Sequence, residues 1–497
     1  MNTPHSSLAS AVAAMPGTPI KRTRSICPEC LQSLDAEVIE RDGQVWMDKR
    51  CPEHGEFSAL LAADARHYYR SAPVAGNGGA CCGGGCGPAT TAEPAGTDLP
   101  WSNHSCTVLI EIIERCNLSC PTCFAGSTPQ HAGLMTMAEF TERLDRLAAG
   151  GKRDADMLQL SGGEPTIHPD LADMVDAAFA RGFRQVTINS NGIRLARADY
   201  VAGLAERVAR HAGCELYIYL QFDGFDADTH AALRGRDDLL EIKRRALEQC
   251  HVHGISVHPV MTLTRGINDH EVGDFVRLAV EQAWIKNVVI QPAMYSGRYD
   301  HPRRVERLTL ADAVRLVCEQ TGEFAPEDFG PIPCSDPNCF GMAVALRTRT
   351  GLLPVSRLFP RHEDWTDPAA RDLIERVTDT LDGPAALSEA FRWAAGHAPL
   401  DEWLSGLADE QVDELLDLVG AAQRGDATLW DRLLTISIKP FMDAWTYDQD
   451  RIDQCCVHIL DPEGQPVSFC EYNAIHRPRI AHTPTSYRGD AVPVVLK

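Results

Sequence analysis

Apolar and polar positions change their period along this chain, and these changes divide it into parts. From residue 106 to residue 291, short apolar runs of strand length alternate with longer segments whose apolar positions recur at helical spacing. The predicted strands cover residues 108–113, 157–160, 185–189, 215–222, 255–263 and 287–291. The predicted helices cover residues 136–149, 170–181, 238–253 and 268–284, with one more that ends near residue 211. Six strand–helix units in strict alternation predict an α/β fold with a parallel sheet and right-handed crossovers.

The segments outside this alternating region predict further parts of the chain. An Ala/Ser/Pro-rich start is predicted to be disordered, and a Gly-rich stretch is predicted to be a linker. The predicted parts are a disordered N-terminus (1–23), a metal module (24–70), the linker (71–105), the alternating region (106–325) and a C-terminal domain (326–497). Within the last part, residues from about 363 to 433 are acidic and helical, and their apolar faces are expected to be core.

The acidic composition and the cysteine content narrow the classes of function. The chain has 497 residues, a formal net charge of −22 and no basic run, so binding to a nucleic-acid backbone is not expected. The sequence contains no apolar stretch of about 18 residues and no secretion-signal pattern. Its 18 cysteines, in a long acidic chain, favour metal binding over a disulfide scaffold. A cytoplasmic, reducing location is therefore expected.

Three cysteines lie close together directly after the first predicted strand. Cys116, Cys120 and Cys123 form a Cys-x3-Cys-x2-Cys triplet in the segment Glu114-Arg-Cys-Asn-Leu-Ser-Cys-Pro-Thr-Cys-Phe124. Three thiolates at this spacing can hold three irons of a four-iron cluster and leave the fourth iron open to a small molecule. The alternative is three buried or unpaired thiols, but free cysteines seldom recur at such spacing.

A glycine-rich turn follows the second predicted strand. In Gly162-Gly163-Glu164-Pro165, two residues without a Cβ let the backbone approach a ligand, and one carboxylate can accept from an ammonium group. Together with the triplet, this turn resembles the radical S-adenosylmethionine (SAM) superfamily. The resemblance implies a partial (β/α)6 barrel with a [4Fe-4S] cluster whose open iron binds SAM. It also implies cleavage of SAM to a 5′-deoxyadenosyl radical, and a turn that binds the methionine amine.

Further candidate contacts to SAM lie at the carboxyl ends of later strands, where the active groups of such sheets gather. Ser190 and Asn191 offer polar contacts to a ribose, although an Asn-Gly pair is also a common turn. Gln221 and Asp223 end another strand, and their place at the barrel mouth favours a functional role over a plain turn. Phe124 is the candidate for the adenine contact, because the residue before the third cysteine is not the aromatic that the family commonly has.

Two pairs of potential ligands near the N-terminus predict a metal site. Cys27, Cys30, Cys51 and His54 lie in two knuckles about twenty residues apart, as in a zinc-ribbon or rubredoxin-like module. A sulfur-rich tetrahedral site suits zinc or a single iron, and the sequence does not separate the two. The alternative is a loop histidine with Cys51 unliganded. A module of this size would depend on its metal for much of its folding.

Two other groups of cysteines predict auxiliary clusters. The first group, in and after the linker, either completes a four-cysteine cluster or belongs to a flexible loop; its members are Cys81, Cys82, Cys86 and Cys106. The second group would fasten a C-terminal iron–sulfur cap to the barrel through an auxiliary [4Fe-4S] cluster. Its members are Cys334, Cys339, Cys470 and one of Cys455 or Cys456, with Cys455 assigned.

The order of these motifs is similar to that of the multi-cluster radical SAM group that includes archaeal tetraether lipid synthase, also described as a dihydropterin methyltransferase. The resemblance extends from about residue 27 to about residue 477, and it departs in the linker, where Ala89 replaces a cysteine. It implies hydrogen abstraction from an unactivated carbon, which needs a cofactor-derived radical. Lipid-chain carbon–carbon coupling is the expected reaction. The alternatives are radical methylation of a pterin or similar small molecule, and a multi-cluster electron carrier without chemistry of its own.

The expected partners follow from these alternatives. They are a small-molecule or lipid substrate and a reductant such as ferredoxin or flavodoxin. A lipid substrate would bring peripheral contact with a membrane surface, which the acidic balance of the chain disfavours. Two arginines near the barrel mouth, Arg234 and Arg298, are interpreted as solvated or salt-bridged side chains rather than as contacts to a substrate phosphate.

Overall fold

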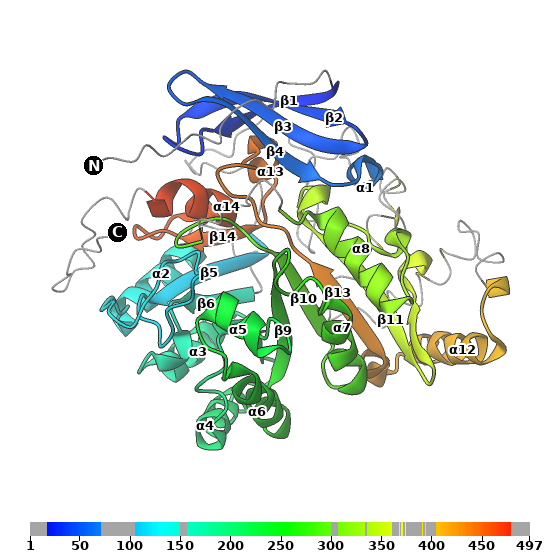
Figure 1. The fold of residues 1–497 in the computed structure, drawn as a ribbon. Helices are drawn as coiled ribbons and strands as arrows, with labels where there is room; N and C mark the ends of the chain where they lie inside the picture. Colours follow the sequence, from blue (N-terminus) through cyan, green and yellow to red (C-terminus); the bar gives the residue numbers. More distant parts are fainter. Residues whose placement is uncertain are drawn as a thin grey trace.

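The computed structural model describes residues 17–70, 105–149, 157–299, 307–332, 335–359 and 404–478, with a few positions between 367 and 393. An antiparallel sheet of four strands lies beside an eleven-stranded sheet that carries helices on one face (Figure 1). The predicted α/β fold with a parallel sheet and an N-terminal metal module is confirmed. Within the described residues, the structure has no helix whose length and apolar character would let it cross a bilayer.

Six consecutive parallel strands form the centre of the large sheet, as the alternating pattern predicts. They are β5 (Thr107–Ile113), β6 (Met157–Gly162), β7 (Gln185–Ser190), β8 (Glu215–Gln221), β9 (Ser256–Leu263) and β10 (Asn287–Pro292). Two further strands join this sheet in parallel, β14 (Val457–Leu460) beside β5 and β13 (Leu433–Ile438) beside β10. The sheet ends in three antiparallel strands, β11 (Gly341–Thr348), β12 (Gly351–Pro354) and β15 (Pro466–Ser468). The strands after the predicted boundary at residue 325 belong to the same sheet as the six central strands, so this boundary does not separate two sheets.

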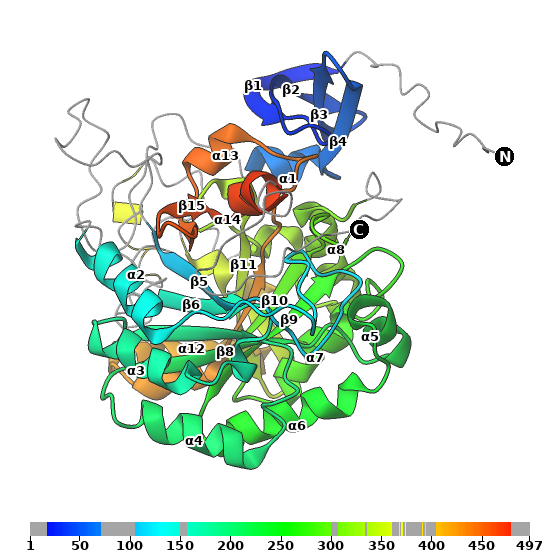
Figure 2. The same ribbon diagram turned by 90° about the vertical axis from the view of Figure 1, so that its left-hand side faces the viewer.

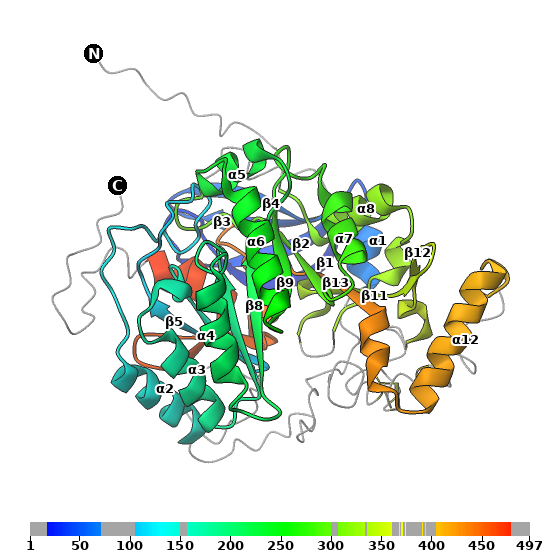
Figure 3. The same cartoon turned by 90° about the horizontal axis from the view of Figure 1, so that it is seen from below.

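Helices cover the outer face of the large sheet (Figure 3). They are α2 (Met137–Ala149), α3 (Leu171–Ala180), α4 (Ala198–Val208), α5 (Ala227–Arg234), α6 (Leu239–Val252), α7 (Val272–Glu281) and α8 (Leu310–Thr321). Every second strand residue, such as Leu216, Ile218 and Leu220, packs into a core that these helices share. The intervening residues lie on the opposite side of the sheet, which is called the inner face below, because successive side chains of a strand alternate between faces.

The four-stranded sheet begins earlier than the sequence indicates. Its strands are β1 (Thr18–Ile26), β2 (Ser33–Arg41), β3 (Gln44–Cys51) and β4 (Gly55–Ala62), followed by α1 (Ala65–Arg70). The prediction of disorder over residues 1–23 is therefore wrong from Thr18 onward, and the residues before 17 lie outside the described part. Tertiary contacts explain the difference, because Thr23 donates to Asp448 Oδ1 at 2.8 Å and Ser25 donates to the Tyr447 carbonyl at 2.6 Å.

A buried lysine fixes this sheet against the C-terminal segment. Lys49 Nζ donates to the carbonyl oxygens of Ala444 at 2.8 Å and Trp445 at 2.9 Å, and to Ser25 Oγ at 3.0 Å. Lys21 adds an ion pair to Asp448 at 2.8 Å. Figure 2 shows the four strands grouped with α13 (Gln449–Asp453) and α14 (Phe469–Glu471) on one side of the molecule. The N-terminal module is therefore attached to the segment that leads to Cys455.

The predicted helical insertion is described only in part. Its helix α12 (Asp409–Gln423) packs Leu415 and Leu418 against the core of β11 and β12, so this apolar face is core, as expected, although Leu416 is exposed. The segment ends at β13, which begins at Leu433. Figure 1 shows α12 at the edge of the molecule, beside β11 and far from β5.

Candidate active site

The three clustered cysteines lie in the loop that follows β5. Cys123 N donates to the Cys120 carbonyl at 3.3 Å, and Leu118 N donates to Cys116 Sγ at 3.4 Å. These local hydrogen bonds help to fix the conformation of the loop that carries the thiols. Burial, the Glu164 carboxylate and the other two thiols raise the pKa of Cys116 to about 12. The structure therefore brings the three predicted iron ligands together, with Glu164 near them.

Arg298, which was interpreted from the sequence as a solvated or salt-bridged side chain, holds this loop. Half-buried Arg298 donates from Nη2 to the carbonyls of Cys120 and Ser127, both at 2.9 Å, and from Nη1 to that of Gly126 at 2.8 Å. Its backbone N–H donates to the Cys123 carbonyl at 3.0 Å. The interpretation of Arg298 as a solvated or salt-bridged side chain is wrong, because its donors are used by loop carbonyls. The Ser-Gly-Arg sequence soon after the last central strand was the only available signal.

We expect Arg298→Lys to lower the iron content of the anaerobically reconstituted protein by roughly threefold or more. A single ammonium cannot span three carbonyl groups, and each unsatisfied buried acceptor costs about 1–3 kcal/mol. Iron and sulfide per chain measure the effect. The matched control is Arg245→Lys, because among the described residues the Arg245 side chain donates a single long hydrogen bond, to the Ala196 carbonyl at 3.4 Å. Equal iron content in the two variants would contradict the expectation.

Two glycines bring the end of β6 against the cysteine loop. Gly162 has φ +126°, and a Cβ there would lie 2.1 Å from the Ile113 carbonyl oxygen. A Cβ on Gly163 would lie 2.2 Å from the Arg115 carbonyl oxygen. Glu164 N donates to that same Arg115 carbonyl at 3.0 Å. Only glycine fits this close approach, so the donor set of three thiols and the turn beside it suit a cluster that binds a small molecule.

Glu164 is almost fully buried and is held by hydrogen bonds. Its Oε1 accepts from Thr166 Oγ1 at 2.5 Å and from Ser190 Oγ at 2.9 Å, and its Oε2 accepts from Asn191 N at 2.8 Å. Burial raises its pKa, against the effect of these hydrogen bonds. Because Oε2 accepts one bond among the described residues, it can accept another from a ligand ammonium. Pro165 begins the short helical turn that follows.

Ser190 and Asn191 are therefore engaged by the protein itself. Besides their bonds to Glu164, Asn191 Nδ2 donates to Asn117 Oδ1 at 2.7 Å in the cysteine loop. They position the carboxylate and join it to the loop, whereas their contact with a ribose stays a prediction.

A buried charge cluster follows β8. Asp223 is fully buried at φ +69°, and it accepts from Arg234 Nε at 2.7 Å and from Lys243 Nζ at 3.0 Å. These two cations hold the pKa of Asp223 far below its usual range, although burial opposes the shift. Arg234 also donates to Gln221 Oε1 at 3.0 Å and hydrogen-bonds to the Cys120 thiol.

The interpretation of Arg234 as salt-bridged is thus confirmed. Gln221 and Asp223 both orient Arg234 beside the cysteine loop, and their direct contact with SAM stays a prediction.

Phe124 joins the cysteine loop to the C-terminal segment. Its ring meets that of Phe469 edge to face at 5.9 Å, and the Arg477 guanidinium lies 5.8 Å from its centre. Arg477 in turn pairs with Glu111 of β5 at 2.6 Å. The adenine contact assigned to Phe124 stays a prediction.

The four predicted ligands of the N-terminal module converge. The ligand atoms of Cys27, Cys30, Cys51 and His54 all lie within 4.8 Å of one another. His54 Nδ1 is 3.4 Å from Cys51 Sγ, and Cys30 Sγ is 3.8 Å from Cys51 Sγ. Three sulfurs and one imidazole at these separations suit a single tetrahedral zinc or iron ion. The alternative, a loop histidine with Cys51 unliganded, does not match this geometry, because His54 and Cys51 both lie in the group.

Three cysteines of the C-terminal group also gather. Burial and the nearby thiols of Cys455 and Cys339 raise the pKa of Cys470 to about 12. Arg451 donates to Cys339 Sγ from two nitrogens, each at 3.3 Å. The Cys456 side chain is buried and is not among the thiols that act on Cys470 or Cys339, and the Cys456 carbonyl accepts from Cys106 N at 2.8 Å. This geometry favours Cys455 over Cys456 as a ligand.

Some predicted ligands lie outside the described residues. These are Cys81, Cys82, Cys86 and Cys334. Cys106 is described and is half-buried beside the Cys455–Cys456 segment.

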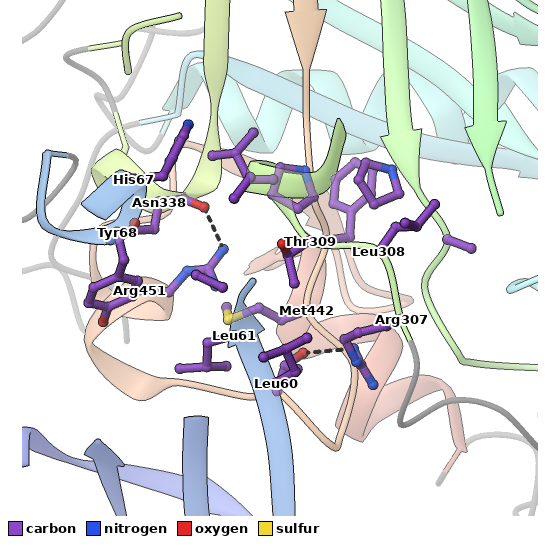
Figure 4. A pocket seen from close by; sticks show the side chains of 18 residues that line it. Leu60, Leu61, His67, Tyr68, Arg307, Leu308, Thr309, Asn338, Met442 and Arg451 are labelled. Atoms are coloured by element: carbon purple, nitrogen blue, oxygen red, sulfur yellow. Dashed lines mark hydrogen bonds between the residues drawn. The ribbon is translucent and has the colours of Figure 1, made fainter. Parts of the chain in front are cut away.

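A pocket lies where the N-terminal module meets the barrel (Figure 4). Leu60 of β4, Thr309 near α8 and Met442 line it from three parts of the chain. Its charged groups are satisfied within the protein, since Arg307 pairs with Asp443 at 3.0 Å and Arg451 donates to the Asn338 carbonyl at 3.2 Å. We therefore interpret this pocket as a junction between parts of the chain.

The inner face of the large sheet is mostly polar. Gln159 donates to Asn189 Oδ1 at 2.6 Å, and Asn189 donates to Ser161 Oγ at 3.1 Å, which links β6 with β7. The half-buried polar residues of this face are Glu111, Gln159, Asn189, Tyr217, Tyr219, Gln221, His258, Thr262, Gln291 and Lys439. Most of these residues, apart from Gln221, are not among the candidates from the sequence, although their alternation with core residues is visible there.

Comparison with known proteins adds the following findings. Residues 19–63 match the HMPTM N-terminal zinc ribbon domain, and residues 110–279 match the radical SAM superfamily. The chain is 31% identical, over 93% of its length and 94% of the other, to the 7,8-dihydro-6-hydroxymethylpterin dimethyltransferase of Methanocaldococcus jannaschii. It is 29% identical to the probable GTP 3′,8-cyclase of Methanothermobacter thermautotrophicus, over 36% of this chain and 55% of that protein. The solved structure of Streptococcus suis SuiB bound to precursor peptide SuiA aligns with 44% of this chain and 46% of that chain at 16% identity and a TM-score of 0.36.

Proposed function

The chain belongs to the radical SAM superfamily and, within it, to the family of the 7,8-dihydro-6-hydroxymethylpterin dimethyltransferase, and from this premise we propose that it methylates a pterin or a similar small heterocycle. The polar inner face is the observation that carries the proposal. An alkyl chain would leave the Tyr219 hydroxyl, the His258 imidazole and the Lys439 ammonium without partners, whereas a heterocycle can hydrogen-bond to them. The inner face therefore supports methylation over lipid coupling.

The described residues have separate tasks in this proposal. Cys116, Cys120 and Cys123 would hold a [4Fe-4S] cluster, which with SAM supplies the 5′-deoxyadenosyl radical when bound. Glu164 would accept a hydrogen bond from the SAM ammonium through Oε2. Arg298 keeps the cysteine loop in one conformation through the carbonyls of Cys120, Gly126 and Ser127.

The other metal sites are also part of the proposal. Cys339, Cys455 and Cys470 would hold an auxiliary cluster, where the Arg451 guanidinium would offset the negative charge of the thiolates. Cys27, Cys30, Cys51 and His54 would hold one zinc or iron ion. A reductant such as ferredoxin or flavodoxin would supply electrons. An electron carrier without chemistry is disfavoured, because a local triplet leaves one iron without a protein ligand.

The test is an anaerobic reaction of the reconstituted protein with SAM, a reductant and 7,8-dihydro-6-hydroxymethylpterin. We expect 5′-deoxyadenosine to form and the pterin to gain the mass of one or two methylene groups. A methyl-labelled SAM separates SAM from another one-carbon donor. Parallel reactions with diacyl lipids would show loss of two hydrogens if coupling were the true reaction. That loss, with the pterin unchanged, would overturn the proposal, as would failure to cleave SAM.

A further inference from the structure

Three polar side chains of the inner face have no partner within the described protein. Tyr219 lies in β8 and His258 in the neighbouring β9, and Lys439 directly follows β13, which β10 separates from β9. Among the described residues, the Tyr219 hydroxyl and the Lys439 ammonium make no hydrogen bond or ion pair. His258 Nδ1 is buried without a hydrogen-bond partner. A ligand that supplies hydrogen-bond partners to such groups binds more tightly, because they otherwise stay unsatisfied.

Several other polar side chains of this face are satisfied within the protein, although Thr187 Oγ1 is also buried without a hydrogen-bond partner. Asn189 pairs with Gln159, Gln221 accepts from Arg234, and the Tyr217 hydroxyl donates to Glu215 at the opposite end of the strand. Tyr219 and His258 are direct neighbours and the Lys439 charge acts on Tyr219, so these three lie in one part of the inner face.

His258 and Tyr219 place two polar aromatic rings side by side, with their planes inclined by 62°. The two residues are paired across β8 and β9, and their ring centres lie 5.5 Å apart. Burial lowers the pKa of His258 to about 4, so the imidazole is neutral at pH 7. A neutral imidazole offers one donor and one acceptor, and a phenol offers both as well. This combination matches the mixed donors and acceptors on the edge of a nitrogen heterocycle.

Lys439 adds a positive charge to this surface. Its ammonium lies 5.6 Å from the centre of the Phe441 ring. Burial raises the pKa of Tyr219, and the charge of Lys439 opposes this rise, so the two groups lie close to each other. It also acts on Cys455, at the predicted auxiliary cluster. Because no carboxylate of the described residues pairs with it, an anionic oxygen of a ligand is the partner that its charge favours.

We propose that Tyr219, His258 and Lys439 bind the substrate, with the first two on the edge of a flat heterocycle and Lys439 on an anionic oxygen of its side chain. This inference rests on the proposed function and narrows the substrate to an anionic derivative of a hydroxymethyl dihydropterin. The anionic oxygen comes from a phosphate ester or from a carboxylate.

Anaerobic calorimetry on the reconstituted full chain tests the proposal with three probes: 7,8-dihydro-6-hydroxymethylpterin, its phosphate ester and the 6-carboxy analogue. We expect wild-type protein to bind one of the two anionic probes at least tenfold more tightly than the alcohol, and the preferred probe identifies the anion.

Lys439→Met should remove this preference, and Lys439→Arg should retain most of it. Tyr219→Phe and His258→Leu should each weaken all three probes by roughly tenfold. Tyr217→Phe is the matched control, because its hydroxyl bonds Glu215, and it should change binding less than twofold.

The outcomes separate this site from the proposed function. Protein that methylates the pterin without preferring an anionic probe, or a Lys439→Met variant that keeps the preference, overturns the site and leaves methylation standing. A Lys439→Met variant that changes only the reduction potential of a cluster also overturns it, since Lys439 would then serve Cys455. Protein that cleaves SAM but binds none of the three probes overturns both.

Discussion

Replacing Cys120 by alanine is expected to lower SAM cleavage by roughly a thousandfold or more, which corresponds to about 4 kcal/mol of barrier. Cys120 is one of three thiols in the loop after β5, and its loss would leave two local ligands for a four-iron cluster. The measurements are 5′-deoxyadenosine release with a chemical reductant, and iron and sulfide per chain. We expect the same result for Cys116→Ala and Cys123→Ala.

The control for this experiment is Cys250→Ala. Cys250 lies in α6, is 1% exposed and packs among apolar side chains of the main core, so its thiol serves packing. We expect normal cleavage from this variant, with a stability loss of about 1 kcal/mol. If Cys120→Ala retained wild-type cleavage and iron content, the triplet would not hold the cluster that the proposed function requires.

The strands of the central sheet could be predicted because each is a short apolar run between amphipathic helices. β7 (Gln185–Ser190) and β9 (Ser256–Leu263) differ by only one residue at an end from the predicted spans. The sequence also placed the cysteine triplet and the Gly-Gly-Glu-Pro turn at adjacent strand ends, because parallel strands present their carboxyl ends on one edge. The hydrogen bond from Glu164 N to the Arg115 carbonyl shows the two loops in contact.

The edges of the sheet and the start of the chain could not be predicted in this way. β13 and β14 lie more than a hundred residues from the parallel strands beside them, β10 and β5, and nothing local specifies such pairing. β1 lies next to an Ala/Ser/Pro-rich stretch, and its strand depends on Thr23, Ser25 and the partner segment near Tyr447. Local composition indicates disorder where tertiary contacts order the chain.

The roles of polar groups at strand ends were the hardest to predict. Ser190 and Asn191 suit a ribose by their chemistry, yet their hydrogen bonds go to Glu164. Arg298 was interpreted as solvated because the residues next to it in the sequence offer no evident hydrogen-bond partner for its side chain. Its partners, the carbonyls of Cys120, Gly126 and Ser127, lie about 170 residues earlier in the chain. A sequence lists side chains, whereas these roles depend on backbone groups that folding brings close.

Replacing Asp223 by asparagine is expected to destabilise the region around β8, α5 and α6 by about 3–5 kcal/mol, because it leaves two buried cations without their counter-charge. Arg234 and Lys243 both donate to this carboxylate, and all three side chains are largely buried. Hydrogen exchange of the amides in β8 and α6 measures the local free energy of opening. The cysteine loop should also lose iron, since Arg234 would no longer be fixed beside Cys120.

The pH dependence of this deficit has a definite sign. Because the folded pKa of Asp223 is lowered, its stabilisation is complete above the unfolded pKa of about 3.9 and is lost only as the pH falls through the lower folded value. Burial lowers the pKa of Lys243 to about 8, while Asp223 supports its charge. In the variant, Lys243 would release its proton below pH 8, where the unfolded chain still binds it, so the stability of the variant rises with pH there. The deficit should therefore be largest near pH 5 and should narrow toward pH 8.

The control is Asp226→Asn, because Asp226 is an exposed partner of His270, and it should change stability by less than about 0.5 kcal/mol throughout this pH range. An Asp223→Asn deficit as small as that of this control would mean that the buried cations do not depend on the carboxylate.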